Sequence, residues 1–101
     1  MMITITCTDK EIRVAGHASD AEHPRNEETV QACASITALV QTLMSAIHHL
    51  CNEYPPYSIG KGNFVLDKTN LSKQAQFCTD VFIIGCRYVQ SGYPDHIIVQ
   101  A

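Results

Sequence analysis

Positive charge is scarce in this chain, which has seven Lys and Arg residues against ten Asp and Glu and a formal net charge of −3. The basic residues are scattered and form no stripe that could neutralise phosphates, so we expect no nucleic-acid partner. Long apolar runs are also missing, because none approaches the roughly 20 residues that cross a bilayer. The N-terminal segment 1–6 has neither the basic region nor the cleavage site of a signal peptide. We therefore expect no membrane partner.

Paired cysteine spacings are absent as well. The count of five cysteines is odd, and no CxxC spacing occurs among Cys7, Cys33, Cys51, Cys78 and Cys86. A secreted disulfide framework more often has an even count in a loop-rich chain. We therefore expect free thiols and a cytoplasmic location. Repeats, low-complexity segments and internal boundaries are missing too, which favours one domain over residues 1–101.

Apolar residues make up 46% of the chain and charged residues 17%, which is typical of a folded globular protein. Residues 2–7 and 11–17 alternate between apolar and polar side chains, and this pattern predicts an antiparallel hairpin. In the second strand the alternation places Gly16 on the inward face with Ile12 and Val14, and it places His17 on the opposite face.

Two helices are predicted by apolar residues that recur at steps of three and four. The first is expected to begin at the cap Asn26, with Thr29 as a later candidate, and to end at Pro55-Pro56. The second spans about residues 71–92, with Gly92 in the left-handed C-terminal position. Further strands are expected around Tyr57, at 63–68 and at 96–100. The order ββαββαβ predicts an α+β fold, in which two helices pack on one face of a small, mostly antiparallel sheet.

His17 and Cys33 are the candidate reactive pair, because a strand end and the start of the next helix can be brought together. An imidazole within reach of a thiol can take its proton, and the thiolate is a nucleophile. Backbone N–H groups at the helix start could stabilise an oxyanion. With a cap at Asn26, however, Cys33 falls in the second turn, where the helix dipole helps less. On spacing alone, the competing interpretation of Cys33 as a core residue and His17 as a loop residue is stronger.

Two motifs change that balance. Gly16-His17-Ala18, followed after a loop by the run Cys33-Ala34-Ser35-Ile36-Thr37-Ala38-Leu39, resembles the signature of the bacterial ribosomal-processing cysteine proteases. In that family, Gly-His-Ala ends the second strand and a Cys-Ala run opens the first long helix. The C-terminal segment with Tyr93-Pro94 is similar to the ending of the family, so the resemblance covers nearly the whole chain.

The resemblance implies a cysteine endopeptidase that removes an N-terminal extension from a bacterial large-subunit ribosomal protein, number twenty-seven, after an aromatic residue. It implies that Cys33 is the nucleophile and His17 the general base. It also implies that Gly16, Ala34 and Thr37 bind the substrate. Neither a cofactor nor a metal is expected. The expected partners are the protein or peptide substrate, a ribosomal protein precursor, and a second copy in a homodimer.

The chain departs from the family pattern just before the cysteine. Val30 stands three residues before Cys33, where the family has an Asp, and a preceding Gly is missing. Gln31-Ala32 replaces an apolar pair, and the loop after His17 is about four residues longer. These departures suggest a divergent member, one that a phage could carry, with a non-standard substrate.

Two alternatives remain open from the sequence. The first is a peptide- or protein-binding module on the same fold whose catalysis is impaired. The second is a metal site made by His17, His23 and Cys33. His23 is more simply interpreted as a solvated loop residue, and it could replace His17 as the base if the loop folds back over Cys33. His48 and His49, near the end of the first helix, have a poor spacing for zinc and suit the negative end of a helix dipole.

Overall fold

A computed structural model describes residues 2–17 and 26–101 of the chain. The elements in chain order are β1 (Ile3–Cys7), β2 (Glu11–Ala15), α1 (Glu27–His49), β3 (Tyr57–Gly60), β4 (Asn63–Asp67), α2 (Lys73–Gly92) and β5 (Ile97–Gln100). This ββαββαβ order is the one predicted from the sequence.

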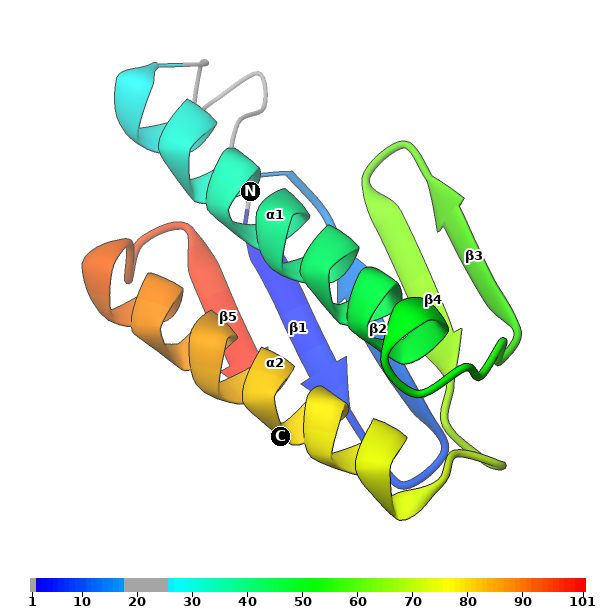
Figure 1. The fold of residues 1–101 in the computed structure, drawn as a ribbon. Coiled ribbons are helices and arrows are strands. Elements are labelled where there is room, and N and C mark those ends of the chain that lie inside the picture. The colour runs from blue at the N-terminus through cyan, green and yellow to red at the C-terminus, as the bar shows by residue number, and fades with distance from the viewer. Residues whose placement is uncertain (1, 18–25) are drawn as a thin grey trace.

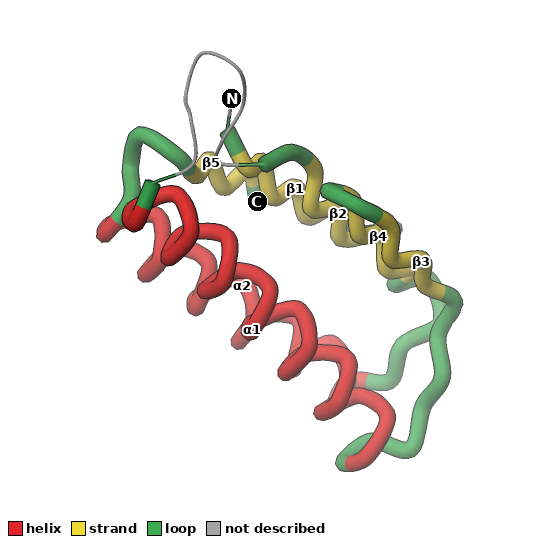
Figure 2. Tube along the Cα trace, turned by 90° about the horizontal axis from the view of Figure 1, so that it is seen from above, coloured by secondary structure: helices red, strands yellow, loops and turns green. Residues whose placement is uncertain are grey.

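One five-stranded sheet has the strand order β3-β4-β2-β1-β5. Three of its four pairings are antiparallel, and only β1 with β5 is parallel. Both helices lie side by side on the same face of this sheet, as the two views show (Figure 1, Figure 2). The predicted α+β fold with two layers is therefore confirmed.

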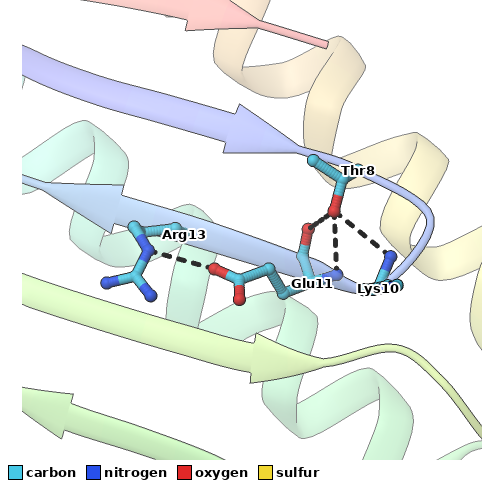
Figure 3. Close-up of polar contacts among 4 residues, drawn as sticks. All are labelled: Thr8, Lys10, Glu11 and Arg13. Carbon is cyan, nitrogen blue, oxygen red and sulfur yellow. Dashed lines mark hydrogen bonds and ion pairs between the residues drawn. The ribbon is translucent and has the colours of Figure 1, made fainter.

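The turn between β1 and β2 is held by the hydroxyl of Thr8 (Figure 3). Its oxygen accepts hydrogen bonds from the backbone N–H groups of Lys10 and Glu11, each at 3.2 Å. The Glu11 carboxylate also pairs with the Nε of Arg13 at 3.0 Å on the exposed face of β2. The turn joins β1 and β2 in the register in which Ile5 faces Val14.

Helix α1 begins with a capping box. The Asn26 side chain accepts from the N–H of Thr29 at 2.9 Å, and the Thr29 hydroxyl accepts from the N–H of Asn26 at 2.9 Å. The predicted cap is therefore confirmed, but the predicted end is wrong. The helix ends at His49, and Asn52 has a φ of 54°, so the chain turns before it reaches Pro55-Pro56.

The apolar side chains that recur along α1 at steps of three and four predict its packed face, and most of those from Ile36 to Ile47 are buried. The buried residues are Thr29, Ala32, Ile36, Val40, Leu43, Met44 and Ile47. Val30 is 37% exposed and Cys33 is half-buried at the edge of this face. By length and composition alone α1 could also cross a membrane, contrary to the sequence-based expectation, although a core helix has the same composition. Here its buried residues share the core with the strands.

Helix α2 is capped by Ser72, whose hydroxyl oxygen accepts from the N–H of Ala75 at 3.1 Å. The helix ends at Gly92, and the cap is Tyr93 with a φ of −135°. Gly92 is therefore helical, and the prediction that it adopts the left-handed conformation is wrong. Gly85 allows the two helices to approach closely, because an ideal Cβ built there would lie 2.9 Å from the Cδ2 of Leu39 on α1.

Candidate active site

The strand β2 ends at a glycine that changes the direction of the chain. Gly16 has a φ of +99°, a conformation that L side chains rarely adopt. Its N–H still donates to the carbonyl of Gly62 at 2.9 Å, which extends the pairing of β2 with β4 by one step. The regular alternation of a strand stops here, and His17 lies beyond the end of β2. His17 is exposed, and it lines a cavity together with Val14 and Gly16.

This apolar cavity has a volume of about 190 Å³ and lies between α1, the N-terminal strands and the β3–β4 hairpin. Its apolar walls are Ile3, Val14, Ile36, Val40, Ile59 and Phe64. Its polar lining groups are His17, Cys33, Thr37, Gln41 and Asn63. The sequence-predicted pair is thus brought to one cavity, from the end of β2 and from the second turn of α1.

A second hollow of about 500 Å³, the α1 groove, follows the surface of α1 on the other side of the pair. His17, Cys33 and Thr37 line both hollows, and Ala34 lines the α1 groove. Gly16 lines only the apolar cavity. All five residues singled out from the motifs therefore lie at this place, and the pair stands where the two hollows meet.

The position of Cys33 within α1 limits what the helix start can contribute. The helix begins at Glu27, and Cys33 is therefore in its second turn. The N–H of Cys33 lies inside the helix, where it bonds to the carbonyl four residues earlier. The expectation that free N–H groups at the helix end serve an oxyanion beside Cys33 does not fit this placement. The free amides of the first turn are one turn away from the sulfur.

The hydroxyl of Thr37 is also committed to the helix backbone. It donates to the carbonyl of Cys33 at 2.9 Å, a contact typical of Thr one turn further along a helix. The bond leaves the hydroxyl on the backbone of the residue that carries the sulfur, one turn before Thr37.

Sequence reasoning offered Tyr57 and Phe64 as possible lining of an apolar groove, with packing as the simpler interpretation, and missed the other contributions of the β3–β4 hairpin. Ile59, Gly60, Gly62, Asn63 and Phe64 all line the apolar cavity. The hairpin lies far from the Cys and His motifs in sequence, and only the pairing of β2 with β4 brings it there. The two glycines on either side of Lys61 are the local signal, and by themselves they predict only a turn.

The remaining thiols lie away from the two hollows. Burial raises the pKa of Cys86 to about 12. Cys51 and Cys78 are free and their sulfurs lie 3.9 Å apart, and burial followed by the hydrogen bond with Cys78 raises the pKa of Cys51. The Nζ of Lys68 donates to the sulfur of Cys7 at 3.3 Å. All five thiols are free, as expected.

Across residues 2–17 and 26–101, no group of three or more His, Cys, Asp and Glu side chains is placed to hold a metal ion. His23, a member of the alternative metal site, lies outside the described residues. His48 stacks on Tyr54 with ring centroids 5.1 Å apart, and this contact accounts for its position at the end of α1.

Comparison with known proteins gives one family. The family model described as cysteine protease Prp matches residues 2–98. No curated protein sequence matches the chain significantly.

Solved structures share the fold. The ribosomal processing protease Prp from S. aureus with a covalently linked product peptide is 21% identical, with a TM-score of 0.76, covering 98% of this chain and 96% of that one. The same enzyme with a substrate peptide is 18% identical, with a TM-score of 0.75 and the same coverage. SMU.848 from Streptococcus mutans is 16% identical, with a TM-score of 0.76, covering 98% of this chain and 92% of that one.

The family match spans almost the entire chain, and the fold matches that of the S. aureus protease over 98% of the chain. A thiol and an imidazole, those of Cys33 and His17, line one cavity. The chain therefore belongs to the cysteine protease Prp family and is a cysteine protease.

Proposed function

We propose that the chain is an endopeptidase in which Cys33 is the nucleophile and His17 the general base. The observation that carries this proposal is that both side chains line the apolar cavity and the α1 groove, at the place where the two meet. Cys33 is half-buried at the edge of the packed face of α1, so its sulfur remains accessible. A residue that only fills the core would need neither to line these hollows nor to lie half-buried at the edge of the packed face.

The reaction follows from these two groups. His17 takes the proton of the Cys33 thiol, and the thiolate attacks the carbonyl carbon of the scissile bond. The tetrahedral intermediate collapses when the C–N bond breaks, and His17 returns the proton to the leaving amine. A water molecule, deprotonated by His17, then attacks the thioester and releases the new carboxyl end. The Cys33 thiol is restored when the sulfur regains the proton.

The apolar cavity supports an aromatic residue before the cut. Its walls are aliphatic apart from Phe64, and the reactive pair stands at its rim. An apolar cavity of about 150 Å³ is enough for a benzene ring, and the volume here is about 190 Å³. The α1 groove on the other side, where Ala34 and Ala38 are small, is open to the chain that follows the cut.

The substrate that we propose is the precursor of a bacterial large-subunit ribosomal protein, from which the N-terminal extension is removed. The family and the S. aureus enzymes, described as ribosomal processing proteases crystallised with substrate and product peptides, support this choice. We further propose a cytoplasmic protein that acts as a single domain over residues 1–101.

Cleavage of a peptide with one aromatic residue in an apolar stretch tests the reaction, with products identified by mass spectrometry. Cys33→Ala should lower the rate of cleavage by about 10⁴-fold or more. His17→Ala should also abolish most of the cleavage activity. Cys7→Ala changes another partly exposed thiol outside both hollows and should keep full activity. Cleavage that persists in Cys33→Ala would contradict the assignment of Cys33 as the nucleophile. Binding without cleavage by the unmodified protein would instead favour the impaired binding module.

The substrate assignment has its own test. The ribosomal protein precursor should lose its extension when incubated with the protein, and intact-mass measurement should place the cut after the aromatic residue. A precursor in which that residue is replaced by Gly is the matched control and should remain uncut. Equal cleavage of both precursors would contradict the assignment.

A homodimer is proposed through the outer face of α2. Four large apolar side chains between 53% and 76% exposed form a stripe there: Phe77, Val81, Ile84 and Tyr88. Their spacing of four, three and four is the same in both directions, so an antiparallel second copy would present a matching stripe across a two-fold axis. Val81→Lys should give a monomer in sedimentation analysis, whereas Leu50→Lys, off the stripe, should not. A monomer already in the unmodified protein would contradict the proposal.

A further inference from the structure

His17 packs directly on the turn between β3 and β4. An ideal Cβ built on Gly62 would lie 2.9 Å from both the Cδ2 and the Cε1 of His17, and closer still to its Nε2. Real Cβ atoms essentially never come within 3.0 Å of such neighbours. The imidazole therefore occupies the space that any side chain at position 62 would need.

The turn and the end of β2 form one rigid unit. The N–H of Gly16, directly before His17, donates to the carbonyl of Gly62 at 2.9 Å, and Ala15 pairs with Asn63. The backbone on both sides of the contact is thus held by the sheet. Because the strands cannot move apart without breaking this ladder, a side chain at 62 would displace the ring rather than the turn.

Among residues 2–17 and 26–101, no hydrogen bond holds the His17 side chain. A general base usually depends on a partner that orients it. Here the contact that the described residues provide is steric, and Gly62 supplies it. Gly62 also lines the apolar cavity beside His17 and Cys33, so the contact lies at the place where the ring must approach the sulfur.

We propose that Gly62 is a positioning residue for His17. Because Gly62 has no Cβ, it leaves the space that the imidazole occupies, and this space, called the seat below, sets how the ring approaches Cys33. The proposal rests on the proposed roles of the two residues in catalysis. The φ of +71° at Gly62 is a separate requirement of the turn. Asn tolerates that conformation better than Ala does, so the two effects can be separated by substitution.

Gly62→Ala and Gly62→Asn are the test variants, and both should shift the NMR signals of the His17 ring while those of His48 and His96 stay in place. A displacement of about 1 Å can cost about 100-fold in rate. We therefore expect kcat for peptide cleavage to fall about 100-fold in both variants with KM nearly unchanged. Melting temperature should fall in Gly62→Ala and much less in Gly62→Asn.

Two control variants isolate the contact. Lys61→Ala changes the same turn without adding atoms toward the ring, and Gly92→Ala makes the same chemical change where a Cβ meets nothing within 4 Å. Both should leave kcat and the His17 signals unchanged. Unchanged His17 signals in Gly62→Asn, or full activity in that variant, would overturn the seat. If the signals move but the unmodified protein cuts no peptide, the seat stands and the proposed function fails.

Discussion

The hydroxyl of Tyr93, at the C-terminal cap of α2, donates to the Oε1 of Gln31 on α1 at 2.8 Å. Gln31 lies two residues before Cys33, so this bond ties the end of one helix to the turn that carries the candidate nucleophile. His96 and Glu28 add a second contact at 3.7 Å between the same two regions. The departure of Gln31 from the family pattern thus acquires a role in this chain, because only a polar side chain can accept from Tyr93.

Tyr93→Phe should therefore destabilise the protein by about 0.5–1 kcal/mol, since it removes one exposed hydrogen bond and little apolar contact. Urea unfolding measures this change. Tyr54→Phe is the matched control, because Tyr54 is 76% exposed and its substitution should change stability by less. Equal stability of Tyr93→Phe and the unmodified protein would show that the bond does not tie the helices in solution.

Acid should weaken the start of α2. Hydrogen bonds from the hydroxyl and the backbone N–H of Ser72 lower the pKa of Glu53. Because the folded-state pKa lies below that of the unfolded chain, this stabilisation is complete above the usual pKa of about 4.5 and is lost as pH falls through the folded value. Glu53→Gln should reduce the loss of melting temperature between pH 6 and pH 3.

Asp67 must be considered in the same experiment. Hydrogen bonds from Thr69 lower its pKa also, so part of the acid sensitivity belongs to Asp67. Asp67→Asn should remove that second part, and the double variant should be the least sensitive to acid. A pH dependence that is identical in Glu53→Gln and in the unmodified protein would contradict the assignment to Glu53.

Alkylation should distinguish the thiols. Burial raises the pKa of Cys86 to about 12, so almost none of it is thiolate at neutral pH. With iodoacetamide at pH 7, peptide mapping should find Cys33 modified early and Cys86 last. His17→Ala should slow the modification of Cys33 and leave that of Cys7 unchanged. Early modification of Cys86 in the folded protein would show that it is not buried as described.

The packing of the two helices predicts a coupled pair of substitutions. Gly85→Ala brings a Cβ to 2.9 Å from the Cδ2 of Leu39, and overpacking of this kind costs about 1–3 kcal/mol. The higher helix propensity of Ala offsets about 0.8–1 kcal/mol of this cost. The free energy of unfolding should therefore fall by about 1 kcal/mol. In a Leu39→Ala background the collision is gone, and Gly85→Ala should then be stabilising. Additive effects in this double-mutant cycle would contradict the close approach.

Much of the fold could be predicted from local patterns. The hairpin 2–17 follows from alternation, and the start of α1 follows from the capping chemistry of Asn26 with Thr29. The C-terminal ends of the two helices were harder to predict, because more than one residue near each end can stop a helix. Pro55-Pro56 can stop a helix, yet the chain had already turned at Asn52. Gly92 suits a left-handed cap, yet it remained helical, since propensity at one residue is a weak constraint.

The site was predicted in part. Cys33 and His17 were singled out from their motifs, and the structure places both at one cavity. That His17 borders the same cavity as Val14 and Gly16 could not be predicted, because strict alternation cannot foresee the break at Gly16. Apart from Phe64, the lining residues of the β3–β4 hairpin were missed, since no local signal links a turn near Lys61 to a histidine at the end of another strand.

The sequence by itself determined the order of elements, the start of α1 and the two candidate reactive residues, because periodicity, capping and motifs act within a few neighbouring residues. Only the tertiary structure decided that Cys33 lies at the edge of a packed face, that His17 and Cys33 line one cavity and that Gly62 lies against the imidazole ring. The reason is that these relations depend on the pairing of β2 with β4 and on the packing of α1 over the sheet, which join segments distant in the chain.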